Sequence, residues 1–139
     1  MARSSMAEWA GKSARLTVVV TEDLLDRFVA VSGDSSPIHV STAAAKARGF
    51  AGRVAHGLLL GSLVSSIIGT QLPGEDGVLQ EIKLAFHNPC YVGDTVVIDV
   101  GVSDVHESVR ALTCSVRVSN QAGLLLAKGH FRSGLVEVV

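Results

Sequence analysis

A carboxylate and an imidazole lie five residues apart in a short polar segment of this chain, at Asp34 and His39. Between them stands Pro37, so the helix that precedes Gly33 cannot continue through the segment and we expect a loop over 33–39. One group of such a pair can take a proton from water while the other supplies a proton to a neighbouring carbon, as the hydration of an activated double bond requires. Asp34 and His39 are therefore the acid–base candidates.

A second set of candidates lies at the start of an uncharged run from Val54 to Gly74. This run predicts a helix that begins near Val54–His56, is buried on nearly all sides and ends at the Leu-Pro-Gly of 72–74. The free N–H groups of such a helix start can polarise a carbonyl oxygen and stabilise an enolate. Gly57 would let a ligand approach the backbone closely, and Ser62 could donate its hydroxyl.

Each candidate also has a purely structural interpretation. Asp34 could be a turn residue that bonds its own backbone, His39 a buried histidine with its hydrogen bonds made, and His56 a cap on the helix start. A metal site built from these three residues would match no standard zinc spacing, so we expect no metal. Cys90 and Cys114 also lie in no metal spacing, and we expect two inert thiols in a reducing compartment.

The remaining pattern predicts one α+β domain. Beyond the helix of the uncharged run, helices are expected over 21–33 and 42–48, and apolar runs predict strands over 16–20, 78–86, 95–102, 112–118 and from 124 to about 131. The 54–71 helix is the long apolar one, so we expect a curved antiparallel sheet wrapped around it. Part of that sheet would stay open, which favours a homodimer.

Composition narrows the class of protein. The formal net charge of −1 provides no basic field for nucleic acid or anionic lipid. The glycines and serines inside the 54–71 run favour a buried helix over a transmembrane one. Residues 1–13 lack the apolar core of a secretory signal, so we expect a flexible N-terminal segment before a single domain at 14–139, and a cytoplasmic protein.

Two motifs, taken together, resemble those of the MaoC-like, (R)-specific enoyl-CoA hydratases, a family with the hot-dog fold. They are Phe28-Val-Ala-Val-Ser-Gly-Asp34-x-x-Pro37-Ile-His39 and Val54-Ala-His56-Gly57-Leu-Leu. The likeness continues through Ser62, Leu72-Pro-Gly74 and Val92-Gly-Asp94, and it covers roughly residues 15–132. The resemblance therefore extends over most of the chain.

The resemblance implies a homodimeric hot-dog hydro-lyase of fatty acid metabolism that needs no cofactor. Such an enzyme adds water reversibly to trans-2-enoyl-CoA and gives (R)-3-hydroxyacyl-CoA. Asp34 and His39 match the family's catalytic pair, Ser62 matches its serine on the central helix, and the amide that binds the thioester carbonyl falls at Gly57. His56, beside that glycine, is expected to contribute to substrate binding by holding the helix start.

Two departures and three alternatives remain open. The family usually has Asn before the proline and Asp shortly after the histidine, where this chain has Ser36 and Ser41, so loop geometry and substrate choice are not fixed by the likeness. A 3-hydroxyacyl-carrier-protein dehydratase would run the reverse reaction with the same residues. A thioesterase would want a carboxylate on the 54–71 helix, which has none, and a mere acyl-thioester binder would not need both Asp34 and His39.

Overall fold

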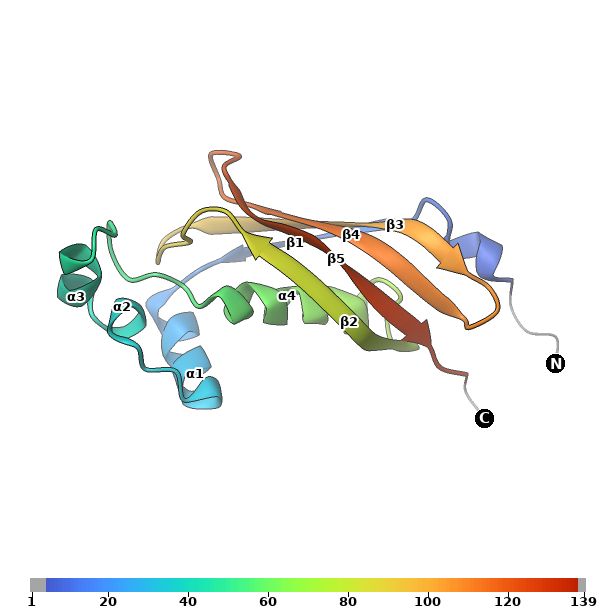
Figure 1. Cartoon of the computed structure of the whole chain (residues 1–139), viewed down its shortest axis with the longest axis horizontal. Coiled ribbons are helices and arrows are strands. Elements are labelled where there is room, and N and C mark those ends of the chain that lie inside the picture. The colour runs from blue at the N-terminus through green and yellow to red at the C-terminus, as the bar shows by residue number, and fades with distance from the viewer. Residues whose placement is uncertain (1–4, 138–139) are drawn as a thin grey trace.

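The computed structural model describes residues 5–137 and shows a five-stranded antiparallel sheet lying over one long helix, α4, with three short helices gathered at the N-terminal end of α4 (Figure 1). The elements in chain order are η1 (Met6–Trp9), β1 (Ser13–Val19), α1 (Glu22–Ser32), α2 (Pro37–Val40), α3 (Thr42–Ala47), α4 (Gly57–Thr70), β2 (Gly77–Phe86), β3 (Thr95–His106), β4 (Ala111–Ser119) and β5 (Leu125–Leu135). This arrangement confirms the predicted α+β class.

The sheet has the strand order β1-β3-β4-β5-β2, so β1 and β2 are its edges. Every neighbouring pair is antiparallel. In β3 the residues Val96, Ile98 and Val100 are buried in alternation, as the period of two along the sequence predicts, and Val116 and Val118 of β4 do the same. These faces form the core against α4.

Helix α4 begins at Gly57, directly after the predicted start near Val54–His56, and His56 is its N-cap residue. Val54 pairs with Tyr91 in an isolated β-bridge, and the Ala55 N–H donates to the Cys90 carbonyl at 2.7 Å, so this stretch is extended. The helix buries one face on the core, whereas Leu58 on its other side is 71% exposed. The expectation that it is buried on nearly all sides is therefore wrong for a single copy.

The predicted loop over 33–39 is wrong in its second half. Pro37 occupies the first turn of the four-residue helix α2, because a proline there needs no N–H partner and its φ already suits a helix. His39 is therefore a helical residue. The preceding helix, α1, has the predicted ends: the Thr21 hydroxyl accepts from the Leu24 N–H, and Gly33 ends the helix with φ +74°.

Part of the predicted flexible N-terminal segment is packed against the core. Residues 6–9 form η1, and the side chain of Met6 is fully buried in the core cluster. The Val102 N–H donates to the Lys12 carbonyl, which ties the segment to β3. Residues 1–4 of the segment lie outside the described residues, and the single domain expected over 14–139 stays a prediction.

None of the helices within residues 5–137 is long and apolar enough to cross a membrane. Helix α4, which the uncharged run pointed to, has 14 residues. A bilayer span would need about 20.

Candidate active site

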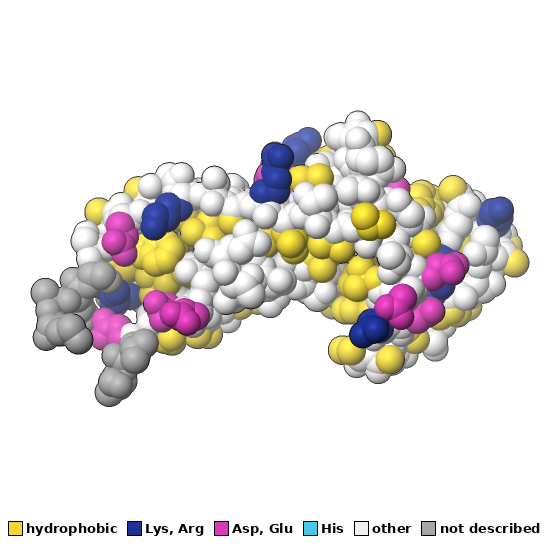
Figure 2. Space-filling model, turned by 180° about the vertical axis from the view of Figure 1, so that it is seen from behind, with side chains coloured by type: hydrophobic (Ala, Val, Ile, Leu, Met, Phe, Trp, Pro, Cys, Tyr) yellow, Lys and Arg dark blue, Asp and Glu magenta, His cyan; other side chains and the backbone are white. Residues whose placement is uncertain are grey.

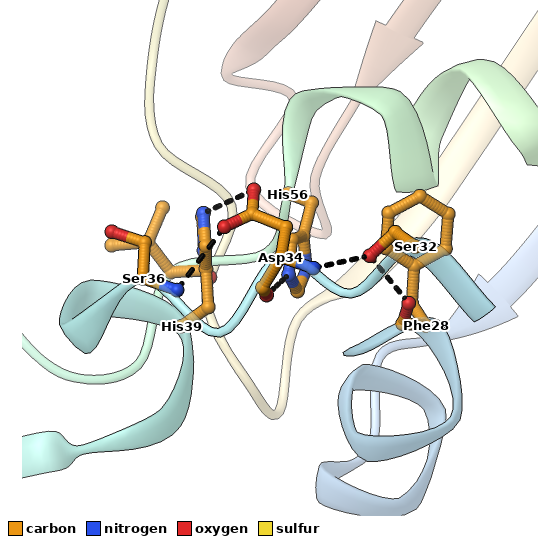
Figure 3. Close-up of polar contacts among 7 residues, drawn as sticks. Phe28, Ser32, Asp34, Ser36, His39 and His56 are labelled. Atoms are coloured by element: carbon orange, nitrogen blue, oxygen red, sulfur yellow. Dashed lines mark hydrogen bonds and ion pairs between the residues drawn. The ribbon is translucent and has the colours of Figure 1, made fainter. Parts of the chain in front are cut away.

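Asp34 and His39 face each other at the end of α1, with the Asp34 Oδ2 and His39 Nε2 atoms 3.6 Å apart (Figure 3). The other carboxylate oxygen, Oδ1, accepts a hydrogen bond from the Ser36 N–H at 3.1 Å. Asp34 is thus also the turn residue that its sequence context allows, but the two roles use different oxygens. The turn leaves Oδ2 directed at the imidazole.

The backbone fixes both the orientation and the tautomer of His39. Its Nδ1 atom lies 2.6 Å from the Val54 carbonyl oxygen. Because a carbonyl can only accept, Nδ1 carries the hydrogen, and in the neutral ring Nε2 keeps its lone pair toward Asp34. The ring is buried, while half of the Asp34 side chain remains exposed, so solvent can reach the pair from the carboxylate side.

His56 holds the Asp34 segment from α4. Its Nε2 lies 2.9 Å from the Asp34 carbonyl oxygen, to which it donates. Its ring stacks on His39 with centroids 3.8 Å apart and lies 4.8 Å from the ring of Phe28. The expectation of a cap is wrong for the side chain, because His56 occupies the N-cap position but makes no capping bond. Its imidazole instead holds the Asp34 backbone and packs against the His39 ring.

The same three residues form the one cluster in residues 5–137 whose side-chain atoms could approach a metal, with ligand atoms within 4.8 Å of one another. The geometry does not suit an ion. The His39 and His56 rings are nearly parallel, at 21°, so an ion shared between them would lie well out of both ring planes. The carbonyl bonds at Nδ1 of His39 and Nε2 of His56 leave His39 Nε2 and the buried His56 Nδ1 as the remaining ring nitrogens of the cluster.

Arg53 holds the backbone carbonyl of His39, a contact that sequence reasoning missed. Its Nε donates to the His39 carbonyl at 2.8 Å and its Nη2 donates to Asp26 Oδ1 at 2.7 Å. The Arg53 side chain is nine-tenths buried, although Asp26 is exposed. The available signal was an isolated arginine directly before the uncharged run at Val54.

Gly57 is the first residue of α4 and lines a cavity of about 420 Å³ together with His39. The N–H groups of the first turn have no acceptor within the helix and can serve a carbonyl oxygen. The ring of Phe86, at the end of β2, lies directly against this glycine: a Cβ atom at Gly57 would stand 3.1–3.3 Å from it. The absence of a side chain at Gly57 therefore makes room for Phe86.

Ser62 lies in a different cavity. Its hydroxyl donates to the Leu59 carbonyl within α4 at 2.7 Å, and it lines a second hollow of about 360 Å³. The structure thus brings Asp34, His39 and His56 together and places Gly57 beside them, but it does not bring Ser62 into the cavity that His39 lines. A contact between Ser62 and substrate stays a prediction.

The two cysteines are buried, as expected of inert thiols. Burial and the neighbouring carboxylate of Asp94 raise the pKa of Cys90 to about 12, and burial raises the pKa of Cys114 to about 12. Cys90 lines the same cavity as His39. At neutral pH it presents a protonated thiol and is a poor nucleophile.

Comparison with known proteins agrees with this geometry. Residues 8–122 match the profile of the MaoC-like domain. The chain belongs to the MaoC-like family. It is 34% identical over 120 residues to the (R)-specific enoyl-CoA hydratase of Aeromonas caviae, a match that covers 86% of this chain and 90% of that protein. The predicted resemblance is confirmed.

Further relatives carry related names. The MaoC-like chain described here is 39% identical over 93 residues to a 3-hydroxybutyryl-CoA dehydratase of Methylorubrum extorquens, a match that covers 64% of this chain and 59% of that protein. The crystallised R-hydratase PhaJ1 of Pseudomonas aeruginosa superimposes with a TM-score of 0.88 at 34% identity, over 96% of this chain and 86% of that one. These relatives are hydro-lyases, and the structural match confirms the hot-dog fold.

Proposed function

We propose that this protein is an (R)-specific enoyl-CoA hydratase, which adds water to trans-2-enoyl-CoA and gives (R)-3-hydroxyacyl-CoA. The observation that carries the proposal is the pair of atoms Asp34 Oδ2 and His39 Nε2, 3.6 Å apart, beside the first turn of α4. A basic pair next to backbone donors is what conjugate addition of water to an enoyl thioester requires.

The pair supplies the proton transfers. A separation of 3.6 Å is too long for a strong direct bond, and both atoms can instead bind one water molecule. As the water oxygen bonds to C3 of the substrate, His39 Nε2 and the Asp34 carboxylate together take a proton from it. The same pair then returns a proton to C2, so the reaction consumes no net proton and needs neither a metal nor a redox cofactor.

The start of α4 stabilises the charge that develops on the substrate. Addition at C3 moves an electron pair toward the thioester oxygen, and the resulting enolate is favoured by N–H donors at a positive helix end. Gly57 is the first residue of this end and borders the cavity that His39 also lines. The carbonyl oxygen would accept from the backbone there, while the acyl chain lies along the apolar side of α4.

A carrier-protein dehydratase is the near alternative, because the reverse reaction uses the same groups. The MaoC-like relatives include a mitochondrial 3-hydroxyacyl-[acyl-carrier-protein] dehydratase of Arabidopsis thaliana, 33% identical over 87 residues. A thioesterase remains disfavoured, since α4 carries no carboxylate to direct water at the carbonyl. The rate of the reaction at C3 relative to the rate of thiol release separates a thioesterase from the two hydro-lyases. A comparison of CoA thioesters with carrier-protein thioesters separates those two from each other.

We further propose that the protein is a homodimer. Strand β2 is an edge strand that pairs with β5 alone, and it carries four exposed apolar side chains: Val78, Leu79, Ile82 and Phe86. Leu58 of α4 is exposed as well. An open edge flanked by apolar surface is a favourable place for a second copy to pair.

The proposed setting is cytoplasmic fatty acid metabolism, with an acyl-CoA thioester as partner and without nucleic acid or membrane. Charged side chains are scattered in small groups on the face shown in Figure 2, among hydrophobic ones, and form no extended field of one sign. With a net charge of −1, this distribution supports a small-molecule substrate.

One assay tests the proposed reaction. Crotonyl-CoA should lose its enoyl absorbance on addition of the enzyme, without release of free thiol, and the product should be the (R)-3-hydroxy thioester. Dehydration of separate (R)- and (S)-3-hydroxybutyryl-CoA should proceed with the (R) form only. Thiol release at the rate of absorbance loss would indicate a thioesterase, and binding without turnover of any thioester would indicate a binding protein.

A further inference from the structure

Phe86 borders two cavities. The first, of about 420 Å³, contains His39 and Gly57, and the second, of about 360 Å³, contains Ser62 and Gly61. Among the lining residues that the structure describes, Phe86 alone borders both cavities. A chain that passes from the first cavity into the second must therefore pass the Phe86 ring.

The contact with Gly57 fixes where the ring stands relative to the chemistry. Three ring atoms of Phe86 lie 3.1–3.3 Å from the position that a Cβ on Gly57 would occupy. Gly57 is the residue at which the thioester carbonyl is proposed to bind. The ring thus lies beside C1 of the substrate, at the point where the acyl chain must leave the acid–base pair.

The backbone of Phe86 is held independently of its ring. Phe86 is the last residue of β2 and lies in register opposite Ala127 of β5, and its side chain is 51% exposed in a single copy of the chain. Rotation about its side-chain bonds therefore needs no change in the sheet. The second cavity is lined mainly by aliphatic side chains, Leu58, Leu79, Ile82 and Leu84, which suits a hydrocarbon tail.

We propose that Phe86 limits the length of the acyl chain that this protein accepts, by closing the passage from the His39 cavity to the Ser62 cavity. This inference rests on the proposed function, because it takes an acyl thioester as the substrate. With the ring in place, short enoyl chains are favoured. With the ring removed, the second cavity becomes available to the tail of a longer chain.

The test compares crotonyl-CoA with trans-2-octenoyl-CoA. Phe86→Ala should raise the ratio of kcat/KM for octenoyl over crotonyl by at least about tenfold, since a few methylene groups in an apolar pocket give discrimination of this size. Val78→Ala removes another exposed apolar side chain from β2 that borders neither cavity, and it should leave the ratio unchanged. Light scattering on both variants controls for a change in assembly.

A second substitution closes the new passage again. At Gly61 an added Cβ would meet Leu58 and Leu84 at 3.6 and 3.8 Å, which is ordinary contact, and leucine suits a helix better than glycine. Gly61→Leu in the Phe86→Ala background should fill the second cavity and return the ratio to that of the unmodified protein. If the double variant keeps the octenoyl preference of Phe86→Ala, the longer tail lies elsewhere and the proposal is overturned.

Binding of saturated thioesters separates failure of this inference from failure of the proposed function. Titration calorimetry with butyryl-CoA and octanoyl-CoA needs no hydration. Suppose that the protein hydrates no substrate, and that Phe86→Ala nevertheless strengthens the binding of octanoyl-CoA relative to butyryl-CoA by about tenfold. The role of Phe86 in limiting chain length is then supported, and the hydratase proposal fails. If neither the kinetic ratio nor the binding ratio shifts, or no acyl thioester binds at all, Phe86 is not a gate.

Discussion

The segment that carries Asp34 and His39 and the edge strand β2 meet at Gly57, and they are built in opposite ways. In the segment, backbone partners hold the functional side chains: Ser36 N–H holds the carboxylate, and the Val54 carbonyl holds the imidazole. In β2, apolar side chains such as Phe86 are partly exposed in a single copy and have apolar surroundings in place of hydrogen-bond partners. Backbone anchors fix positions more closely than exposed side chains can.

This difference suggests that the two regions govern different properties: the Asp34–His39 segment governs the chemical step, and β2 governs the choice of acyl chain. The proposed chemistry requires two atoms at a set distance, and the hydrogen bonds of Asp34 and His39 with Ser36, Val54 and His56 provide it within one copy of the chain. The acyl chain requires only apolar room, which β2 can supply with side chains that vary in size. Substitutions in the segment should therefore change kcat, whereas substitutions in β2 should change substrate choice or assembly.

The largest effect is expected at the acid–base pair. Asp34→Asn and His39→Ala should each lower kcat for crotonyl-CoA hydration by about 10²–10⁴-fold, the usual contribution of a positioned acid or base, while circular dichroism shows an unchanged fold. Asp34→Asn keeps the turn, because an amide oxygen can still accept from the Ser36 N–H. A folded Asp34→Asn variant with normal hydration would remove Asp34 from the mechanism.

The next largest effect on kcat is expected at the first turn of α4, where the thioester carbonyl is proposed to bind. Gly57→Val should lower kcat by about 10²–10³-fold, the cost of losing one oxyanion donor. The valine would both crowd the carbonyl site and displace the Phe86 ring. Ser62→Ala should cost less, because the Ser62 hydroxyl is bonded within the helix.

A comparison of His56→Ala with Gly57→Val tests whether the backbone at Gly57, and not the His56 imidazole, acts on the substrate. Because His56 acts through the Asp34 carbonyl and the His39 ring, its loss should reduce kcat less than Gly57→Val. An active Gly57→Val enzyme beside a dead His56→Ala enzyme would make the His56 imidazole the chemical group and reopen the assignment of His39.

A smaller effect is expected from Arg53. Arg53→Ala leaves the His39 carbonyl without its donor and should lower kcat by no more than about 10²-fold, the loss that a displacement of ~1 Å can cause, with little change in KM. Arg27→Ala is the matched control, since Arg27 forms an exposed pair with Asp23 and such pairs contribute little. Equal kinetics for both variants would show that Arg53 does not position His39.

In β2, Val78→Lys should weaken the proposed homodimer and leave the chemical step unchanged. A lysine on an edge strand opposes pairing with a second copy, so light scattering should report a mass near 14.5 kDa where the unmodified protein gives twice that value. A monomeric unmodified protein would contradict the homodimer. A Val78→Lys dimer would place the interface away from this edge.

The smallest effect concerns the buried thiols. Their pKa of about 12 lies above the ordinary value of 9.0, so the folded state keeps protons that the unfolded chain loses. This contribution to stability is full below pH 9 and should decline as the pH rises toward 12. Urea unfolding at pH 8 and pH 10 should show a smaller decline for the Cys90→Ala, Cys114→Ala double variant, and parallel declines would contradict the assignment.

The features that depend on neighbouring residues can be predicted from the sequence. The ends of α1 follow from Thr21 and Gly33, because caps and left-handed turns are local. The alternation along β3 and β4 follows from the period of two. Asp34, His39 and Gly57 were identifiable because their types and spacing within short motifs suggest acid–base chemistry beside a helix start.

The contacts that these residues make with distant parts of the chain are visible only in the tertiary structure. His56 bonds a carbonyl 22 residues earlier, Arg53 bonds one 14 residues earlier, and neither spacing leaves a periodic trace in the sequence. The Phe86 ring meets Gly57 only because the sheet brings the end of β2 onto the start of α4. Such contacts depend on how whole elements pack, and packing is set by the combined shape of many side chains, so no local pattern can specify them.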